Sequence, residues 1–152
     1  MKIGLYVIIL TALLFVPLQR VEIANLEPIQ AVLMHVEGGK IILETDTGSQ
    51  GRGVSVSEAL DDMKHRSPGV VYLDTSQYLF VSNDAIKEIN GIRPYLKNST
   101  WICIWDGQGG FENAVKYVDT HKIGLRMNCW EGFGNLPELP VITIENSDNL
   151  TS

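Results

Sequence analysis

Residues 29–45, IQAVLMHVEGGKIILET, decide the fold of this chain. Two runs rich in apolar and β-branched residues, 29–36 and 40–45, flank Glu37, Gly38 and Gly39. A Gly-Gly pair between two such runs is typical of a hairpin turn, because both central residues can take a positive φ. The stretch therefore predicts a β-hairpin at the start of the folded part of the chain.

The pattern after the hairpin changes from strand to helix. Residues 46–53 combine three glycines with Thr, Ser and Gln, which predicts a loop. Ser55 and Glu58 then have the spacing of a capping box, in which each side chain bonds the backbone at the start of a helix. The apolar residues at helical spacing after it are Val56, Ala59, Leu60 and Met63. Ser67, followed by Pro68 and Gly69, is expected to end this helix.

Further strand and helix patterns alternate to the end of the chain. The expected elements are one bent strand or two strands over 70–73 and 78–81, a helix capped by 82–84, a strand over 100–105, a helix from Phe111 to Gly124, a short strand over 125–130 and a last strand over 140–144. Such alternation favours an α/β (or α+β) fold. We expect a mixed β-sheet opened by the hairpin, with about three helices packed on it, preceded by an N-terminal hydrophobic helix.

The N-terminal segment predicts membrane targeting. Residues 3–18 carry no charge. As a helix they would span about 24 Å, somewhat less than a bilayer core of about 30 Å. A cleavage site ending at Ala24 would place Glu22 where a small residue is needed, so an uncleaved anchor is favoured over a cleaved signal peptide.

These observations predict the following organisation: 1–20 signal anchor or signal peptide, 21–28 linker, 29–146 a single globular domain, and 147–152 a polar tail. The expected location is the cell membrane, spanned once through residues 3–18, with the globular domain outside the cytoplasm. Secretion after cleavage is the alternative. The net charge of −6 argues against a nucleic-acid partner, which requires clustered basic residues.

The two cysteines, Cys103 and Cys129, allow two interpretations. Export from the cytoplasm would permit a disulfide between them, whereas Cys within an apolar strand is commonly a separate buried thiol. No metal site or cofactor is expected, because the three histidines fall on different predicted elements and no Cys or His pair has ligand spacing. No catalytic residue is predicted.

Candidate binding residues fall in two places. Asp46, Asp74 and Asp106 follow predicted strands, and ligands of open α/β sheets gather at the carboxyl ends of strands. The alternative is turn chemistry, since Asp is favoured in turns. Trp130 and Phe133 belong to a loop rich in Gly and aromatic residues, which is either a ligand or partner surface or a loop folded back on the core.

One part of the chain resembles a known family. Residues 51–60, GRGVSVSEAL, are followed by residues 71–82, VYLDTSQYLFVS, and then by Ala85, Ile86 and Ile89. Over roughly residues 30–106 this pattern resembles the N-terminal domain of the C subunits of bacterial spore germinant receptors, the Ger(x)C type. The resemblance implies a non-enzymatic, membrane-associated domain of an endospore-forming bacterium, and it carries over no catalytic residue.

The chain departs from that family at specific positions. The family's subunits have a lipidated Cys after the signal, which is absent here, and they carry further domains. Where they often have His before the second strand, this chain has Thr75 or Gln77.

Three functions are therefore open. The favoured hypothesis is a non-enzymatic, membrane-anchored extracytoplasmic interaction domain with a membrane-protein partner, related to sporulation or germination. The alternatives are a secreted or surface small-ligand-binding domain and a hydrolase whose site has no recognised motif.

Overall fold

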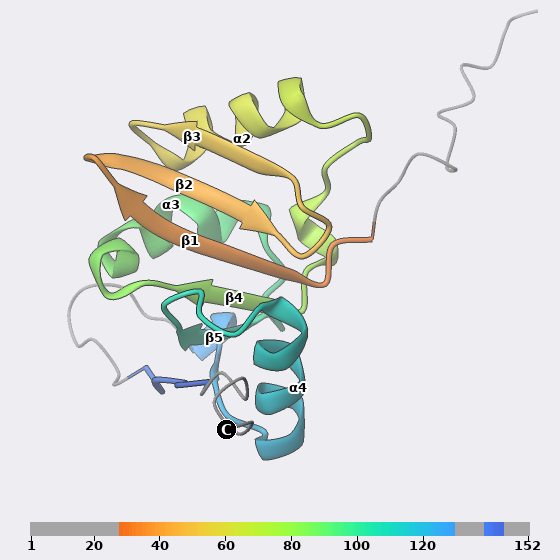
Figure 1. Ribbon diagram of the computed structural model, residues 1–152, viewed down its shortest axis with the longest axis vertical. Coiled ribbons are helices and arrows are strands. Elements are labelled where there is room, and N and C mark those ends of the chain that lie inside the picture. The colour runs from red at the N-terminus through yellow and green to blue at the C-terminus, as the bar shows by residue number, and fades with distance from the viewer. Residues whose placement is uncertain (1–27, 130–138, 145–152) are drawn as a thin grey trace, which may run out of the picture.

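The computed structural model describes residues 28–129 and 139–144, which form a six-stranded mixed sheet with helices on both faces (Figure 1). The strand order is β3-β2-β1-β4-β5-β6. The strands are β1 (Ala31–Glu37), β2 (Lys40–Thr45), β3 (Gln50–Gly53), β4 (Tyr78–Val81), β5 (Trp101–Ile104) and β6 (Leu125–Arg126). The α-helices are α2 (Val56–Arg66), α3 (Ile89–Ile92) and α4 (Phe111–His121). The 3₁₀ turns are η2 (Leu73–Thr75), η3 (Asn83–Glu88), η4 (Arg93–Tyr95) and η5 (Met127–Cys129). This is the mixed sheet with about three helices that the sequence predicts, and its class is α+β.

The predicted hairpin is confirmed. β1 and β2 pair antiparallel, with Glu37 opposite Lys40, and Gly38 and Gly39 connect them with φ of 58° and 75°. β1 then pairs parallel with β4, and β4 pairs parallel with β5. The amino ends of these three strands therefore lie side by side at the same end of the sheet. The predicted N-terminal helix falls outside the described residues, within which no helix has the length and apolar character that crossing a bilayer requires.

The loop prediction for residues 46–53 is wrong in its second half. Gln50–Gly53 forms the edge strand β3, paired antiparallel with β2. The glycines of this strand face α2 so closely that a Cβ on Gly51 would lie 2.0 Å from the carbonyl oxygen of Ala59. Gly51 and Gly53 thus serve close helix-to-strand packing, which local turn rules cannot distinguish from a loop.

The capping box that begins α2 is confirmed, with one change of partner. Glu58 N donates to Ser55 Oγ over 3.2 Å, while the Glu58 carboxylate accepts from Val54 N over 2.7 Å, one residue before the cap. Further along the helix, the Asp62 carboxylate accepts from Arg52 N over 2.9 Å. Two carboxylates of α2 therefore satisfy backbone N–H groups of β3 and of the residue that follows it.

The segment between β4 and β5 is less regular than predicted. The expected helix is a succession of η3, the single turn α3 and η4. Ser82 does not cap it through its side chain; its N–H donates to Met34 O over 2.9 Å, which continues the pairing of β4 with β1. Of the two apolar runs that precede η3, only 78–81 is a strand, because Leu73–Thr75 forms a 3₁₀ turn.

The last two predicted strands are short. β6 has only two residues before η5. The run 140–144 contributes a single parallel bridge, between Val141 and Ile104.

Two hydrophobic clusters lie on opposite faces of the sheet. On one face α2 and the η3-α3 segment pack on Val32, Met34, Leu79 and Ile102. On the other face α4 packs on residues of the alternate positions, including Leu33, Phe80 and Cys103. Ile102 and Cys103, which are adjacent in β5, thus lie on opposite faces of the sheet. Figure 1 shows α2 at the β3 end of the sheet and α4 at the β5 end.

Candidate functional site

An open groove lies between the C-terminal end of α2, the segment that leads from α2 to η2, and η4. Its volume is about 570 Å³. Its lining is mainly apolar and consists of Leu60, Lys64, Gly69, Val70, Val71, Tyr72, Leu73, Asp74, Pro94, Tyr95 and Leu96. We call this feature the Tyr72–Tyr95 groove.

The end of α2 creates the first wall of the groove. Ser67 leaves the helical conformation at φ −71° and ψ 134°, while its N–H still donates to Met63 O. Pro68 cannot continue a helical hydrogen-bond ladder, so the chain turns away and runs back extended. In the extended run Val71 and Leu73 are buried, whereas Val70 and Tyr72 are 42% and 45% exposed. This period of two directs alternate apolar side chains outward.

The floor of the groove is part of the core, and its rim is exposed. Leu60, Val71, Leu73 and Leu96 belong to the hydrophobic cluster beneath α2. Tyr95 of η4 is 37% exposed. Val70, Tyr72 and Tyr95 are three of the five large hydrophobic residues exposed in the described part of the chain; the other two, Val54 and Val141, do not line the groove. A cluster of exposed apolar residues on a firm floor is typical of an interaction surface.

The aspartates predicted from strand ends do not come together. Asp74 lines the groove at the amino end of β4. Asp106 follows β5, at the carboxyl ends of the parallel strands, which is the opposite end of the sheet. Asp106 accepts from Gln108 N over 3.0 Å, which is the turn chemistry of the alternative interpretation. Asp46 accepts from Gln30 N and lies in a hollow on the α4 face. The antiparallel direction of β2 places its carboxyl end beside the amino ends of β1 and β4.

The other predicted surface, formed by Trp130 and Phe133, lies outside the described residues. Nothing in the described part of the chain tests it.

Cys103 and Cys129 are separate free thiols in this structure. The register of β5 and β6 explains why. A Cβ on Gly124 would lie 3.2 Å from Cys103 Sγ, so Gly124 is level with Cys103. Met127 N donates to Thr100 O, which puts the chain three strand residues, about 10 Å, further along before it reaches Cys129. Bridged Cα atoms lie within about 7 Å of each other.

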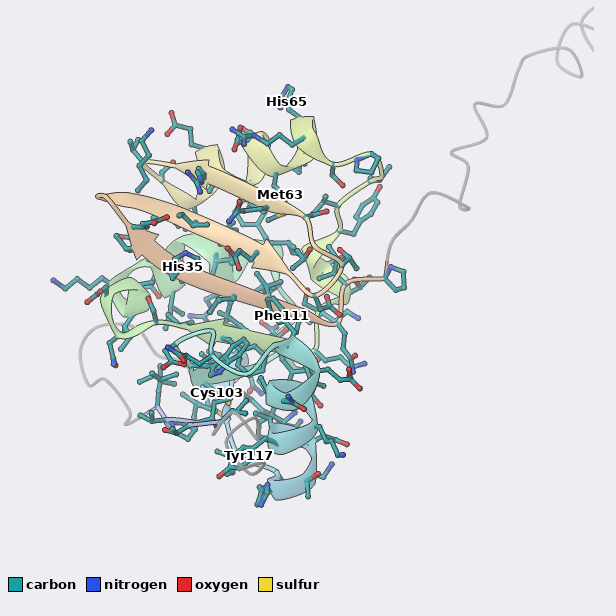
Figure 2. All side chains as sticks on the ribbon, in the orientation of Figure 1. His35, Met63, His65, Cys103, Phe111 and Tyr117 are labelled. Carbon is teal, nitrogen blue, oxygen red and sulfur yellow. The ribbon has the colours of Figure 1, made fainter. Side chains whose placement is uncertain are left out.

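The two thiols have opposite environments. Cys103 is buried beneath α4, and burial raises the pKa of its thiol to about 12. A thiol in this state is a poor nucleophile at neutral pH. Cys129 is exposed at the end of the described segment that contains β6. Figure 2 shows Cys103 beside α4, on the side of the sheet that carries Phe111.

A second hollow of about 460 Å³ lies beside α4, near the amino ends of β1 and β4. In its wall, a hydrogen bond from Lys122, 2.8 Å away, lowers the pKa of Asp119. Burial, and then the nearby Asp119 carboxylate, raise the pKa of Tyr78. The Asp119 shift arises from its ion pair with Lys122 at the end of α4, and the Tyr78 shift arises mainly from burial. Neither shift prepares a group for acid–base chemistry near neutral pH.

Two buried polar atoms on the α4 face, His35 Nδ1 and Ser82 Oγ, have no hydrogen-bond partner. The register of β1 and β4, with Met34 opposite Val81, places His35 and Ser82 at neighbouring positions. No hydrogen bond joins them, so the described residues contain no activated serine there. The same residues contain no group of His, Cys, Asp or Glu side chains that could hold a metal ion.

Sequence reasoning did not identify the groove. The apolar run Val70 to Leu73 was visible in the sequence, but which of its side chains are covered depends on contacts that include η4, about twenty positions downstream. No protein-family model, curated protein or solved structure matches this chain.

Proposed function

We propose that this chain is a non-enzymatic interaction domain, held at the outer face of a membrane by residues 3–18, and that the Tyr72–Tyr95 groove is its working surface. The observation that carries the proposal is the gathering of exposed Val70, Tyr72 and Tyr95 around a hollow with a core floor. Most apolar residues of the described domain are buried in the two clusters on the sheet, so these exposed side chains call for a contact outside the domain.

Three further observations support parts of this proposal. The sixteen uncharged residues 3–18 support the anchor. The buried state of Cys103 and the absence of a hydrogen bond between His35 and Ser82 support a role without covalent catalysis. The resemblance of residues 30–106 to Ger(x)C-type domains supports a role in sporulation or germination.

The exposed thiol of Cys129 provides a direct test of the location. Intact bacterial cells carrying the full chain would be treated with a membrane-impermeant maleimide. The protein would then be isolated and its molecular mass determined by mass spectrometry. We expect one label per chain, at Cys129, because Cys103 is buried and its thiol stays protonated. The chain should also remain in the membrane fraction after alkaline carbonate extraction.

The matched control is Cys129→Ser, which should abolish labelling of intact cells and leave Cys103 reactive only after denaturation. Labelling of Cys129 that requires permeabilised cells would place the domain in the cytoplasm and overturn the proposal. Release of the chain by carbonate would overturn the anchor.

A further inference from the structure

The chain enters its folded domain at the Tyr72–Tyr95 groove. Ile29 is buried in the same cluster as the groove residues Leu73 and Leu96. Its carbonyl accepts from Thr75 Oγ1 over 3.3 Å, and Thr75 directly follows Asp74 of the groove. Figure 1 shows the start of β1 beside the segment that leads from α2 to β4. The first described residue, Pro28, therefore lies on the side of the domain that carries the groove.

The connection between this entry point and the apolar N-terminal run is short. Nine residues, 19–27, separate residues 3–18 from Pro28. Fully extended, nine residues reach about 30 Å, which is no more than the diameter of a small domain. A tether of this length keeps the entry side of the domain, and with it the groove, within reach of the membrane surface.

The residues around the groove have the chemistry of a membrane interface. Tyr72 and Tyr95 present rings with a polar tip, and such residues are enriched where the hydrocarbon meets water. Val70 adds an exposed apolar side chain to the lining of the groove. Lys64 lines the groove and Lys97 follows the lining residue Leu96 in the sequence. Lysine side chains can lay their stems along apolar surface while the charge stays in water.

We propose that the Tyr72–Tyr95 groove faces the membrane and that its occupant is the lipid headgroup region of the bilayer that holds residues 3–18. This inference rests on the proposed function, since it requires the anchor. The contact orients the tethered domain and leaves the α4 face of the sheet directed away from the lipid.

The size of the patch favours lipid over a second protein. Three partly exposed apolar side chains are few for a stable protein interface, which buries about 1,200–2,000 Å² in total. A tethered domain needs far less, because a short linker raises the effective concentration of the bilayer at the groove to the millimolar range, about 1 mM or more. A weak contact is then sufficient to hold one orientation.

The test uses the full chain with Cys129→Ser, inserted in phosphatidylcholine vesicles with and without phosphatidylglycerol. A nitroxide is attached at Val70→Cys in the groove or at Val54→Cys, the matched exposed valine before the other end of α2. The two ends of this eleven-residue helix are about 16 Å apart. Power-saturation electron paramagnetic resonance then compares access of lipid-soluble oxygen and of a water-soluble nickel chelate.

We expect several-fold greater oxygen access relative to nickel at position 70, and the reverse at position 54. If lipid charge contributes through Lys64 and Lys97, phosphatidylglycerol increases the contrast. Equal nickel access at both positions in chains that float with the vesicles would overturn the inference and leave the anchor intact. Spin–spin broadening at position 70 without oxygen access would identify a second copy as the occupant and also overturn it. Chains that do not float with the vesicles would overturn both the anchor and this inference.

Discussion

The two faces of the sheet hold their helices in opposite ways. α2 lies on the glycines of β3, so backbone meets backbone: a Cβ on Gly51 would lie 2.6 Å from Met63 N. α4 instead lies on aromatic rings. The ring centre of Phe80 is 5.0 Å from that of Trp105, which is 5.5 Å from Phe111 at the start of the helix.

Because of this difference, the two faces should respond differently when a substitution changes the volume of a buried side chain. Rings and aliphatic side chains on the α4 face have alternative rotamers and can fill a small change of volume. The backbone of α2 has no such freedom, because its position is also fixed by the carboxylates that it offers to the β3 edge. The α2 face should therefore tolerate added volume least, and the α4 face should tolerate lost volume better.

The largest expected effect comes from Gly51→Ala. A single methyl group would lie 2.0 Å from Ala59 O, a distance that forces α2 away from β3. We expect the free energy of unfolding to fall by about 4 kcal/mol or more, at the upper end of single-residue effects. Urea unfolding followed by tryptophan fluorescence measures this change.

Arg52→Ala is the matched control in the same strand. Its side chain is exposed, so the loss should be about 0.5 kcal/mol or less. A loss for Gly51→Ala no larger than that for Arg52→Ala would show that α2 does not depend on close contact with β3.

The next effect is expected from Phe80→Leu on the opposite face. Phe80 is fully buried, but Leu is apolar and Trp105 and Phe111 can shift toward it. We expect a loss of about 1–2 kcal/mol, smaller than that of the added methyl on Gly51. The same unfolding experiment decides the order, and a greater loss for Phe80→Leu would reverse the comparison between the two faces.

The same contrast shows how much of the fold could be predicted from sequence. The hairpin and the start of α2 depend on neighbours within a few residues, Gly38-Gly39 and Ser55 to Glu58, and both were predicted. β3 was missed because its glycines are required by close packing against residues 59 and 63 of the helix. That contact depends on tertiary structure and is not visible in the local sequence. The segment after Ser82 was predicted as one helix because its apolar spacing does not separate an α-helix from successive 3₁₀ turns.

The candidate site was less predictable than the fold. Asp74 was selected as a strand-end residue, yet it follows no strand and lies in the groove because η2 precedes β4. Asp106 was selected by the same rule and lies at the carboxyl ends of the parallel strands, the opposite end of the sheet from Asp74. Whether two strand ends lie close together depends on the directions of both strands. Because β2 runs antiparallel to β1, β4 and β5, the pairing of the whole sheet must be known before the strand-end residues can be placed.

The smallest expected effect tests the carboxylate that joins α2 to β3. The hydrogen bond from Arg52 N, followed by burial in the opposite sense and then by Arg66 at 2.9 Å, leaves the pKa of Asp62 lowered. A carboxyl group with a lowered pKa stabilises the fold above its ordinary pKa. That contribution is lost as the pH falls through the lower value of the folded state. Acid should therefore weaken the α2 face below about pH 4.

Asp62→Asn isolates this contribution, because the amide keeps an oxygen that can accept from Arg52 N but cannot ionise. We expect a small loss of stability at neutral pH and a shallower fall in the free energy of unfolding between about pH 4 and pH 2. Asp61→Asn is the neighbouring control, since the Asp61 carboxylate has only an exposed contact with Lys64 at 4.0 Å. Urea unfolding across this pH range measures both variants. If Asp61→Asn flattened the acid response as much as Asp62→Asn, the response would belong to the charge of the helix as a whole. The hydrogen bond to β3 would then contribute nothing specific, and the α2 face would depend on its glycines alone.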